Sequence, residues 1–308
     1  DDLSALRAFL TDSSQTKLIH SASEDLEVFS HWLGVLPAPL FDTQRAAALV
    51  GLGAGQSYRA LVAHFFDIEL PKDETQSNWL QRPLTDAQAH YAALDVTYLH
   101  PIGVQLHNRA MECNRLDWVL EEGARLRPGG KPPIAKFKTA YRLQPEQQRV
   151  LAEVVEWREG EARQRDRPRS WILNDKIVMG VAKTVPRSVR ELAAVEDIPQ
   201  GLVRRAGDDL VAHIIDAADT DTDQSLAIIP KPLASEQRGS VSMLSECLKE
   251  IAESLDIPAE VLMPKADLEH LVREQMNPSL AAPENWAGWR AETVVAPLRE
   301  RLKERAAS

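Results

Sequence analysis

The sequence predicts an α/β domain followed by two all-helical domains. Short apolar runs alternate with helical patterns up to residue 122, a Pro/Gly-rich segment interrupts the chain at 128–133, and no alternating strand pattern follows Tyr141. A chain of 308 residues has room for two or three domains at about 150 residues per domain. We therefore expect an α/β domain at 1–127, a linker at 128–140, and helical domains at 141–222 and 223–308.

Composition excludes several classes of protein. Hydrophobic residues make up 44% and charged residues 27% of the chain, which is typical of a globular protein rather than a disordered one. No apolar stretch approaches the roughly 20 residues of a membrane-spanning helix, and no charged-then-apolar leader stands at the start, so we expect a cytoplasmic protein. Cys113 and Cys247 lie far apart, which supports neither a disulfide framework nor a zinc site.

The first predicted element is a short strand at 17–20. Ser21-Ala-Ser-Glu24 then has the spacing of a capping box, and it opens a helix with apolar residues at 26, 29 and 33. A second strand is expected at 40–42, followed by a helix at 43–49. Gly51, Gly53 and Gly55 come after that helix without the Lys-Ser/Thr of a phosphate-binding loop, so they indicate a linker.

The later elements of this domain are helical. Ser57 is expected to cap a helix that carries Leu61 and Phe65. Thr85 and Gln88 again have capping-box spacing and open a helix that runs to about Tyr98. Further helices should continue to about residue 126. The sheet has few strands for so many helices.

Three residues are candidates for chemistry. Asp25 lies in the first turn of a helix that follows a strand end, where α/β sheets commonly present functional groups, although such acids often only complement the helix dipole. Tyr91 and Asp95 are four residues apart and share one helix face. By itself, the spacing of Tyr91 and Asp95 is more typical of a surface hydrogen bond than of catalysis.

The sequence around these residues resembles that of the ribonuclease D family. His20-Ser-Ala-Ser-Glu-Asp-Leu-Glu-Val-Phe29, followed by Leu40-Phe-Asp-Thr-Gln44, is similar to the second exonuclease motif of that family. Gln76 to Thr85 and Tyr91 to Leu99 resemble its third motif. Trp157-Arg-x-x-x-Ala-Arg-x-Arg-Asp and Ser188-Val-Arg-Glu-Leu resemble its first helicase-and-ribonuclease-D C-terminal (HRDC) module, and the last part of the chain resembles a second one more loosely.

The resemblance implies a ribonuclease-H-like exonuclease fold and a two-ion active site. The family uses four carboxylates, in the order Asp, Glu, Asp and Asp, to hold two divalent ions about 3.5–4 Å apart that act together on the phosphodiester. Asp25 matches the third carboxylate, Asp95 the fourth, and Tyr91 the phenol that helps to position the attacking water. An oxygen-only ligand set suits Mg²⁺ or Mn²⁺ and disfavours zinc.

One part of the family pattern is not found. The first motif, Asp-x-Glu on an early strand, should precede Lys17 by some tens of residues, whereas Asp1-Asp2-Leu3 lacks the Glu and the surrounding strand. We therefore expect the exonuclease domain to be incomplete, with its N-terminal strands missing. This chain alone should hold at most one weakly bound ion and should not degrade RNA.

Several basic and aromatic residues are candidates for RNA binding. Lys72 precedes the third motif, where the family tends to place a basic residue facing a substrate phosphate. From Gly123 to Pro145 there are six basic residues and no acid, with aromatic rings between them, which suits unpaired strands. A solvated linker and surface lysines are the alternative reading. The candidates are Lys72, Lys131, Lys136, Phe137, Lys138, Arg163 and Arg165.

The implied reaction is hydrolysis of RNA from its 3′ end with release of nucleoside 5′-monophosphates. The implied substrate is precursor transfer RNA, acted on by a monomer that does not bind membranes. Two alternatives stay open: a DNA-directed proofreading exonuclease of the same superfamily, and a non-catalytic RNA-binding protein.

Overall fold

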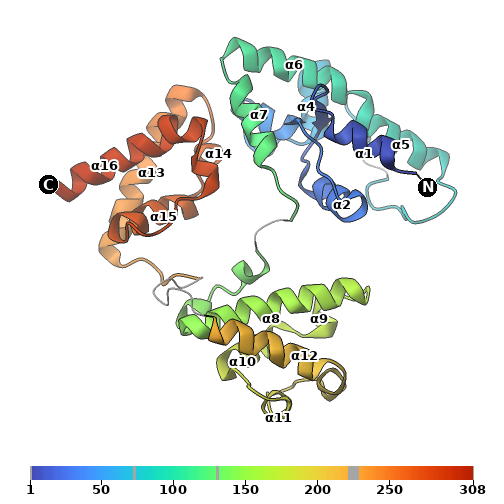
Figure 1. Ribbon diagram of the computed structural model, residues 1–308. Coiled ribbons are helices and arrows are strands. Elements are labelled where there is room, and N and C mark those ends of the chain that lie inside the picture. Colours follow the sequence, from blue (N-terminus) through green and yellow to red (C-terminus); the bar gives the residue numbers. More distant parts are fainter. Residues whose placement is uncertain (1, 72–73, 130–131, 221–228, 308) are drawn as a thin grey trace. The chain divides into compact units, whose positions relative to one another are not determined.

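The computed structural model describes residues 2–71, 74–129, 132–220 and 229–307. The chain forms two compact units, of which one joins residues 1–130 to residues 233–308 and the other comprises residues 131–232 (Figure 1). We refer to residues 2–129 as the N-terminal region, to 132–220 as the first helical module and to 233–307 as the second. In the described part of the chain, no helix is long and apolar enough to cross a membrane.

The N-terminal region contains two parallel strands, β1 (Lys17–Ile19) and β2 (Leu40–Asp42), paired in the register Lys17 to Leu40 and Ile19 to Asp42. Helix α1 (Ser4–Thr11) precedes them, and α2 (Ser23–Leu33) connects them. Both strands were predicted from sequence. The capping box expected at Ser21 is not formed, since the structure gives the start of α2 no side-chain cap from its own segment.

Five helices complete this region: α3 (Thr43–Leu49), α4 (Tyr58–Phe66), α5 (Asp86–Thr97), α6 (Leu99–Glu112) and α7 (Leu116–Arg125). The expected caps are present at two of them. The Ser57 hydroxyl accepts a hydrogen bond from the Ala60 backbone N–H at 3.2 Å. Thr85 and Gln88 form the predicted reciprocal capping box that starts α5. Gly51, Gly53 and Gly55 lie in the loop between α3 and α4, all with positive φ, as expected of a connecting segment.

The first helical module has its own hydrophobic core. It comprises two 3₁₀ turns, η1 (Pro133–Lys136) and η2 (Ala140–Arg142), and helices α8 (Pro145–Gln164), α9 (Arg169–Ile172), α10 (Asp175–Thr184), α11 (Val189–Ala193) and α12 (Gln200–Asp219). Ile134, Phe137 and Ala140 are buried in this core. The segment expected to be a linker at 128–140 is therefore partly built into the module, because its apolar residues recur every third position and face inward.

The second helical module repeats the first. It comprises α13 (Ser235–Leu255), α14 (Ala259–Leu262), α15 (Lys265–Met276), η3 (Glu284–Trp286), the π-helical turn η4 (Ala291–Val295) and α16 (Ala296–Ala307). Its first three helices begin at 235, 259 and 265, each 90 residues after the starts of α8, α9 and α10 at 145, 169 and 175. The turns agree as well, since Asp166 and Asp256 both adopt a left-handed conformation, with φ of 49° and 51°.

The second module packs against α7 of the N-terminal region. Trp118 and Trp289 stack with ring centroids 4.4 Å apart. Glu122 and Arg290 form a buried ion pair, and Arg290 also donates to the backbone oxygens of Val261 and Leu262 at 3.0 Å. A buried pair held this way destabilises the fold when one partner is removed. Helix α7 is thus the anchor of the second module.

Candidate active site

The carboxyl ends of β1 and β2 are held together by one buried residue, Asp42. Its Oδ1 accepts hydrogen bonds from the backbone N–H groups of Gln44 at 2.8 Å and Ser21 at 3.2 Å, and its Oδ2 accepts one from Ala22 at 2.8 Å. Asp42 therefore caps α3 and also fixes the turn that leads into α2. This edge of a parallel sheet is where α/β proteins bind ligands.

Asp25 lies in the first turn of α2, directly after this turn, and its side chain is exposed. Partial burial raises the pKa of the Asp25 carboxyl, and the negative charges of Glu24 and Asp42 raise it further. A carboxylate in a negative field of this kind is stabilised by a bound cation. The position predicted for Asp25 is therefore electrostatically suited to a metal ligand.

Next to this edge lie two aromatic residues that the sequence did not single out. His20 follows β1, its Nδ1 is 2.9 Å from the Thr43 hydroxyl, and its ring meets that of Tyr58 edge-on at 5.8 Å. The Tyr58 hydroxyl donates to the Leu94 backbone oxygen and accepts from the Tyr98 N–H, both at 3.0 Å. Tyr58 thereby connects the strand ends to α5 and α6.

Asp95 lies on α5 beside this connection. Burial raises the pKa of the Asp95 carboxyl. The pKa of the Tyr58 hydroxyl is raised as well, mainly by burial and further by the charge of Asp95, so the two groups are electrostatic neighbours. Asp25 thus has Asp42 as an electrostatic neighbour, and Asp95 has Tyr58.

Tyr91 shares the α5 helix with Asp95 but has other neighbours. Its hydroxyl is 3.3 Å from that of Thr75, and its ring lies 5.9 Å from the ring of Trp79. In this structure the phenol is held by the segment that precedes α5. Its predicted role in positioning water remains a prediction.

The oxygen donors at this edge suit Mg²⁺ or Mn²⁺, but the structure does not assemble a complete ion site. In the residues described, no group of three or more His, Cys, Asp or Glu side chains could hold a metal. Asp25 and Asp95 are a partial donor set, since divalent magnesium prefers near-octahedral oxygen coordination.

The structure divides the residues that were predicted to bind RNA. Lys72 and Lys131 lie outside the described residues. Lys138 is exposed, whereas Lys136 forms an ion pair with Asp175 at 2.8 Å. Phe137 is only 7% exposed within the core of the first module, so the stacking role expected of it does not hold.

Arg163 and Arg165 both lie at the end of α8 and its turn. Arg165 forms an ion pair with Glu161 at 2.8 Å, while Arg163 is exposed. Of this pair, only Arg163 keeps a charge that is not already neutralised by a neighbour on the same helix.

Two sequence-family models match this chain. The model described as "3'-5' exonuclease" matches residues 1–110, and the model described as "HRDC domain" matches residues 147–214. The ribonuclease D of Pseudomonas paraeruginosa is 38% identical over 301 residues, which cover 96% of this chain and 80% of that protein. The ribonuclease D of Escherichia coli is 30% identical, with 98% and 83% covered.

The same relationship is visible in three dimensions. The crystal structure of "Escherichia coli RNase D, an exoribonuclease involved in structured RNA processing" superposes with a TM-score of 0.77 at 30% sequence identity. The match covers 99% of this chain and 83% of that one. It therefore extends over the N-terminal region and both helical modules.

Proposed function

The chain belongs to the ribonuclease D family, and we propose that the full-length protein hydrolyses the unpaired 3′ ends of precursor transfer RNA, releasing nucleoside 5′-monophosphates. Membership of this family makes it a 3′-to-5′ exoribonuclease with a divalent metal requirement. The identities of the substrate and of the ion, Mg²⁺ or Mn²⁺, belong to the proposal, as does action as a monomer.

The proposal is supported by the surroundings of two carboxylates: Asp25 lies in the first turn of α2 after the strand ends, and Asp95 lies on α5, to which Tyr58 is hydrogen-bonded at Leu94. Asp42 fixes the turn before Asp25, and Tyr58 connects that turn to the helix of Asp95. The pKa of each carboxyl is raised by burial.

We infer that Asp25 and Asp95 supply two of the carboxylates of a two-ion site, and that an Asp-x-Glu pair completes it. Such a site, when occupied, activates the attacking water and stabilises the leaving 3′ oxygen. Asp25 and Asp95 would bind the ions, and the Tyr91 hydroxyl would help to orient the attacking water.

The second helical module is inferred to be a second HRDC-type module. The support is the repeat itself, because α13, α14 and α15 follow the spacing of α8, α9 and α10. The family model covers only the first module, at residues 147–214.

The proposal is tested by Asp95→Asn in the full-length protein, with a precursor transfer RNA that carries an unpaired 3′ tail. The variant should lose turnover and keep RNA binding, because a metal ligand is lost while the basic surface is unchanged. Asp86→Asn is the matched control, since Asp86 lies exposed at the start of the same helix α5. Equal turnover by the Asp95 variant and the wild type would refute the assignment.

A second arm separates RNA from DNA. RNA and DNA strands of equal sequence are offered to the full-length protein with Mg²⁺ and with Mn²⁺, and released mononucleotides are measured. The proposal expects preferential degradation of RNA. Equal rates on DNA would favour a proofreading-type exonuclease, and no release from either strand would favour a non-catalytic RNA-binding protein.

A further inference from the structure

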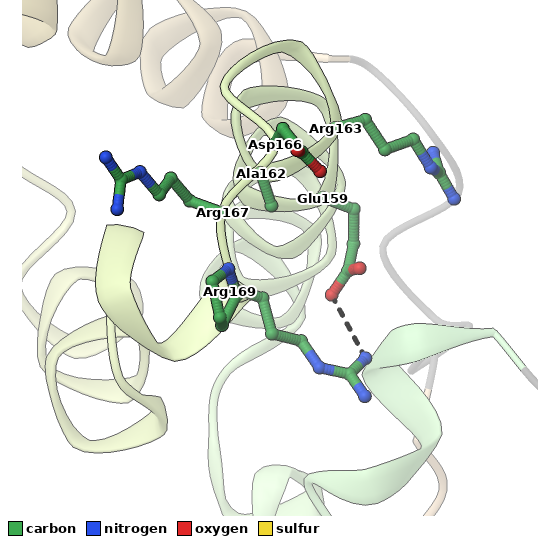
Figure 2. Close-up of a pocket in the computed structure, with 7 residues that line it drawn as sticks. Glu159, Ala162, Arg163, Asp166, Arg167 and Arg169 are labelled. Carbon is green, nitrogen blue, oxygen red and sulfur yellow. Dashed lines mark hydrogen bonds and ion pairs between the residues drawn. The ribbon is translucent and has the colours of Figure 1, made fainter. Parts of the chain in front are cut away.

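The first helical module carries a hollow between the end of α8 and the start of α9, which we call the α8–α9 hollow. Its volume is about 410 Å³, and its charged lining residues are Glu159, Arg163, Asp166, Arg167 and Arg169 (Figure 2). Figure 2 shows Arg163 and Arg167 extending to opposite sides, while Arg169 points to Glu159. The hollow thus has a guanidinium group on either flank.

The arginines of this hollow differ in how far they are neutralised. Arg169 pairs with Glu159 at 3.3 Å, and the buried Arg158 lies 3.5 Å from the same carboxylate. Within the described residues, Arg163 and Arg167 have no carboxylate at ion-pair distance. The charge of Glu159 is therefore already shared, and two exposed cations remain available to an anionic ligand.

An exposed tryptophan stands beside these cations. Trp171 lies on α9 with 70% of its surface exposed, and the Arg167 guanidinium is 5.7 Å from its ring centroid. A ring this exposed gains little from the core of its own module. Aromatic rings beside phosphate-neutralising cations are the elements that bind unpaired nucleic acid, because any base can stack on the ring.

In the second module, the corresponding hollow is in contact with another part of the chain. Ninety residues later, the corresponding hollow of the second module also has two glycines of the N-terminal region in its wall. Its lining residues are Gly51, Gly53, Lys249, Ala252, Glu253, Asp256, Ile257, Pro258 and Ala259. A Cβ at Gly51 would come within 2.7 Å of Asp256 Oδ2, so this approach is close. The second hollow is thus a contact for a protein loop.

The side chains of the two hollows differ in a way that changes the partner. Arg163, Arg167 and Trp171 of the first module correspond to Glu253, Ile257 and Val261 of the second. An acid and two aliphatic side chains suit packing against protein. Two arginines and an exposed indole suit an anionic, aromatic ligand.

We propose that the α8–α9 hollow and Trp171 bind an unpaired segment of the RNA substrate, with a base stacked on Trp171 and neighbouring phosphates neutralised by Arg163 and Arg167. This assignment rests on the proposed function, since it places part of the same substrate. It moves the RNA contact from Phe137 and Arg165, which are buried or paired, to residues that are exposed and unneutralised.

The test is equilibrium binding of a fluorescein-labelled oligouridylate to the full-length protein in EDTA, where the probe is not degraded. Trp171→Leu should weaken binding by about fivefold or more, as expected for the loss of one stacked base. Trp171→Phe should restore most of the affinity because it retains a ring. Trp171 is exposed, so neither change opens a cavity, and unchanged circular dichroism confirms folding.

The arginines are tested by the salt dependence of the same binding. Arg163→Gln with Arg167→Gln should lower the log–log salt slope by about 1.4, at roughly 0.7 for each phosphate contact of a single strand. Arg204→Gln with Arg205→Gln is the matched control, because it removes the same charge from exposed positions on α12 of the same module. The control should leave the slope near the wild-type value.

Asp166→Asn supplies a change in the opposite direction. Asp166 lines the hollow and has a φ of 49°, a conformation that asparagine also tolerates. Removing its negative charge should tighten binding. An unchanged affinity for both the Trp171→Leu and the double arginine variant would overturn the proposal and indicate a protein partner for this hollow. Mononucleotide release measured on the same wild-type preparation tests the proposed function separately.

Discussion

In the first helical module the α8–α9 hollow is lined by Arg163, Arg167 and Arg169, whereas the second module has Glu253, Ile257 and Ala259 at the same positions. The first three helices begin at matched positions in both modules, and the aspartates at 166 and 256 both adopt a left-handed conformation. The helices therefore define where a partner can lie, and the side chains decide which chemistry it must have.

One difference between the two modules is at a matched pair of positions on their first and third helices. In the first module Arg158 is fully buried and donates to Asp175 at 2.7 Å, while the second module has Leu248 and Lys265 instead. Leu248 is buried as well. The same interior position of the first helix can thus be filled by an arginine that pairs with Asp175 or by an apolar side chain.

The largest effect should come from the anchor of the second module. Arg290→Met leaves Glu122 buried without its partner, and the free energy of unfolding should fall by about 3–5 kcal/mol. Urea denaturation of the protein, followed in the unit that joins residues 1–130 to residues 233–308, measures this loss. Arg299→Met is the control, because Arg299 pairs with Glu274 at a partly exposed site and should cost about 1 kcal/mol or less. Equal losses in both variants would mean that the buried pair is not the anchor.

A smaller effect is expected where the second module meets the glycine loop. Gly51 has a φ of 84° and Gly55 a φ of 63°, but only a Cβ at Gly51 would meet Asp256. Gly55→Ala should cost about 1–2 kcal/mol from left-handed strain alone. Gly51→Ala should cost roughly 1–3 kcal/mol more through overpacking. An equal loss in the free energy of unfolding for Gly51→Ala and Gly55→Ala would show that the loop is not in close contact with the second module.

The smallest effect is expected on the acid stability of the first module. Burial raises the pKa of the Asp175 carboxyl, but hydrogen bonds from Lys136 and Arg158 lower it by more, so that the pKa is lowered overall. A lowered folded pKa gives stability that is present above the unfolded value of about 3.9 and is lost as pH falls through the folded pKa. Asp175→Asn should therefore reduce the stability difference between neutral and acidic pH in the first module.

Amide hydrogen exchange of α8 and α10 peptides measures this difference, and α13 and α15 peptides serve as an internal reference. The second module has Lys265 at the matched position, so its acid response should not change. A variant whose α8 and α10 peptides keep the wild-type acid response would show that Asp175 is not the titrating anchor.

Local sequence patterns were sufficient to predict those elements that depend on residues close together in the sequence. The strands at β1 and β2, the cap at Ser57 and the capping box at Thr85 all follow from short spacings. The capping box at Ser21 failed because Asp42, about 20 residues away, supplies the hydrogen bonds instead. No local pattern reveals such a tertiary partner.

The candidate site shows the same limit. Sequence motifs were sufficient to propose Asp25, Tyr91 and Asp95 as site residues. The contacts of Tyr58 with Leu94 and Tyr98, in contrast, depend on how α4 packs against α5 and α6. Phe137 was misread because basic neighbours suggested an exposed ring. The spacing of Ile134, Phe137 and Ala140, one apolar residue in every three, was the signal of a buried face.

The most direct test of the account is a change of metal preference at Asp95. Asp95→Cys in the full-length protein replaces an oxygen ligand with a thiolate, which binds softer ions better than Mg²⁺. We expect mononucleotide release to be lost with Mg²⁺ and regained in part with Mn²⁺ or Cd²⁺, while Asp86→Cys keeps its Mg²⁺ activity. If the Asp95→Cys variant released mononucleotides with Mg²⁺ at the wild-type rate, the claim that Asp95 is a metal ligand would be contradicted.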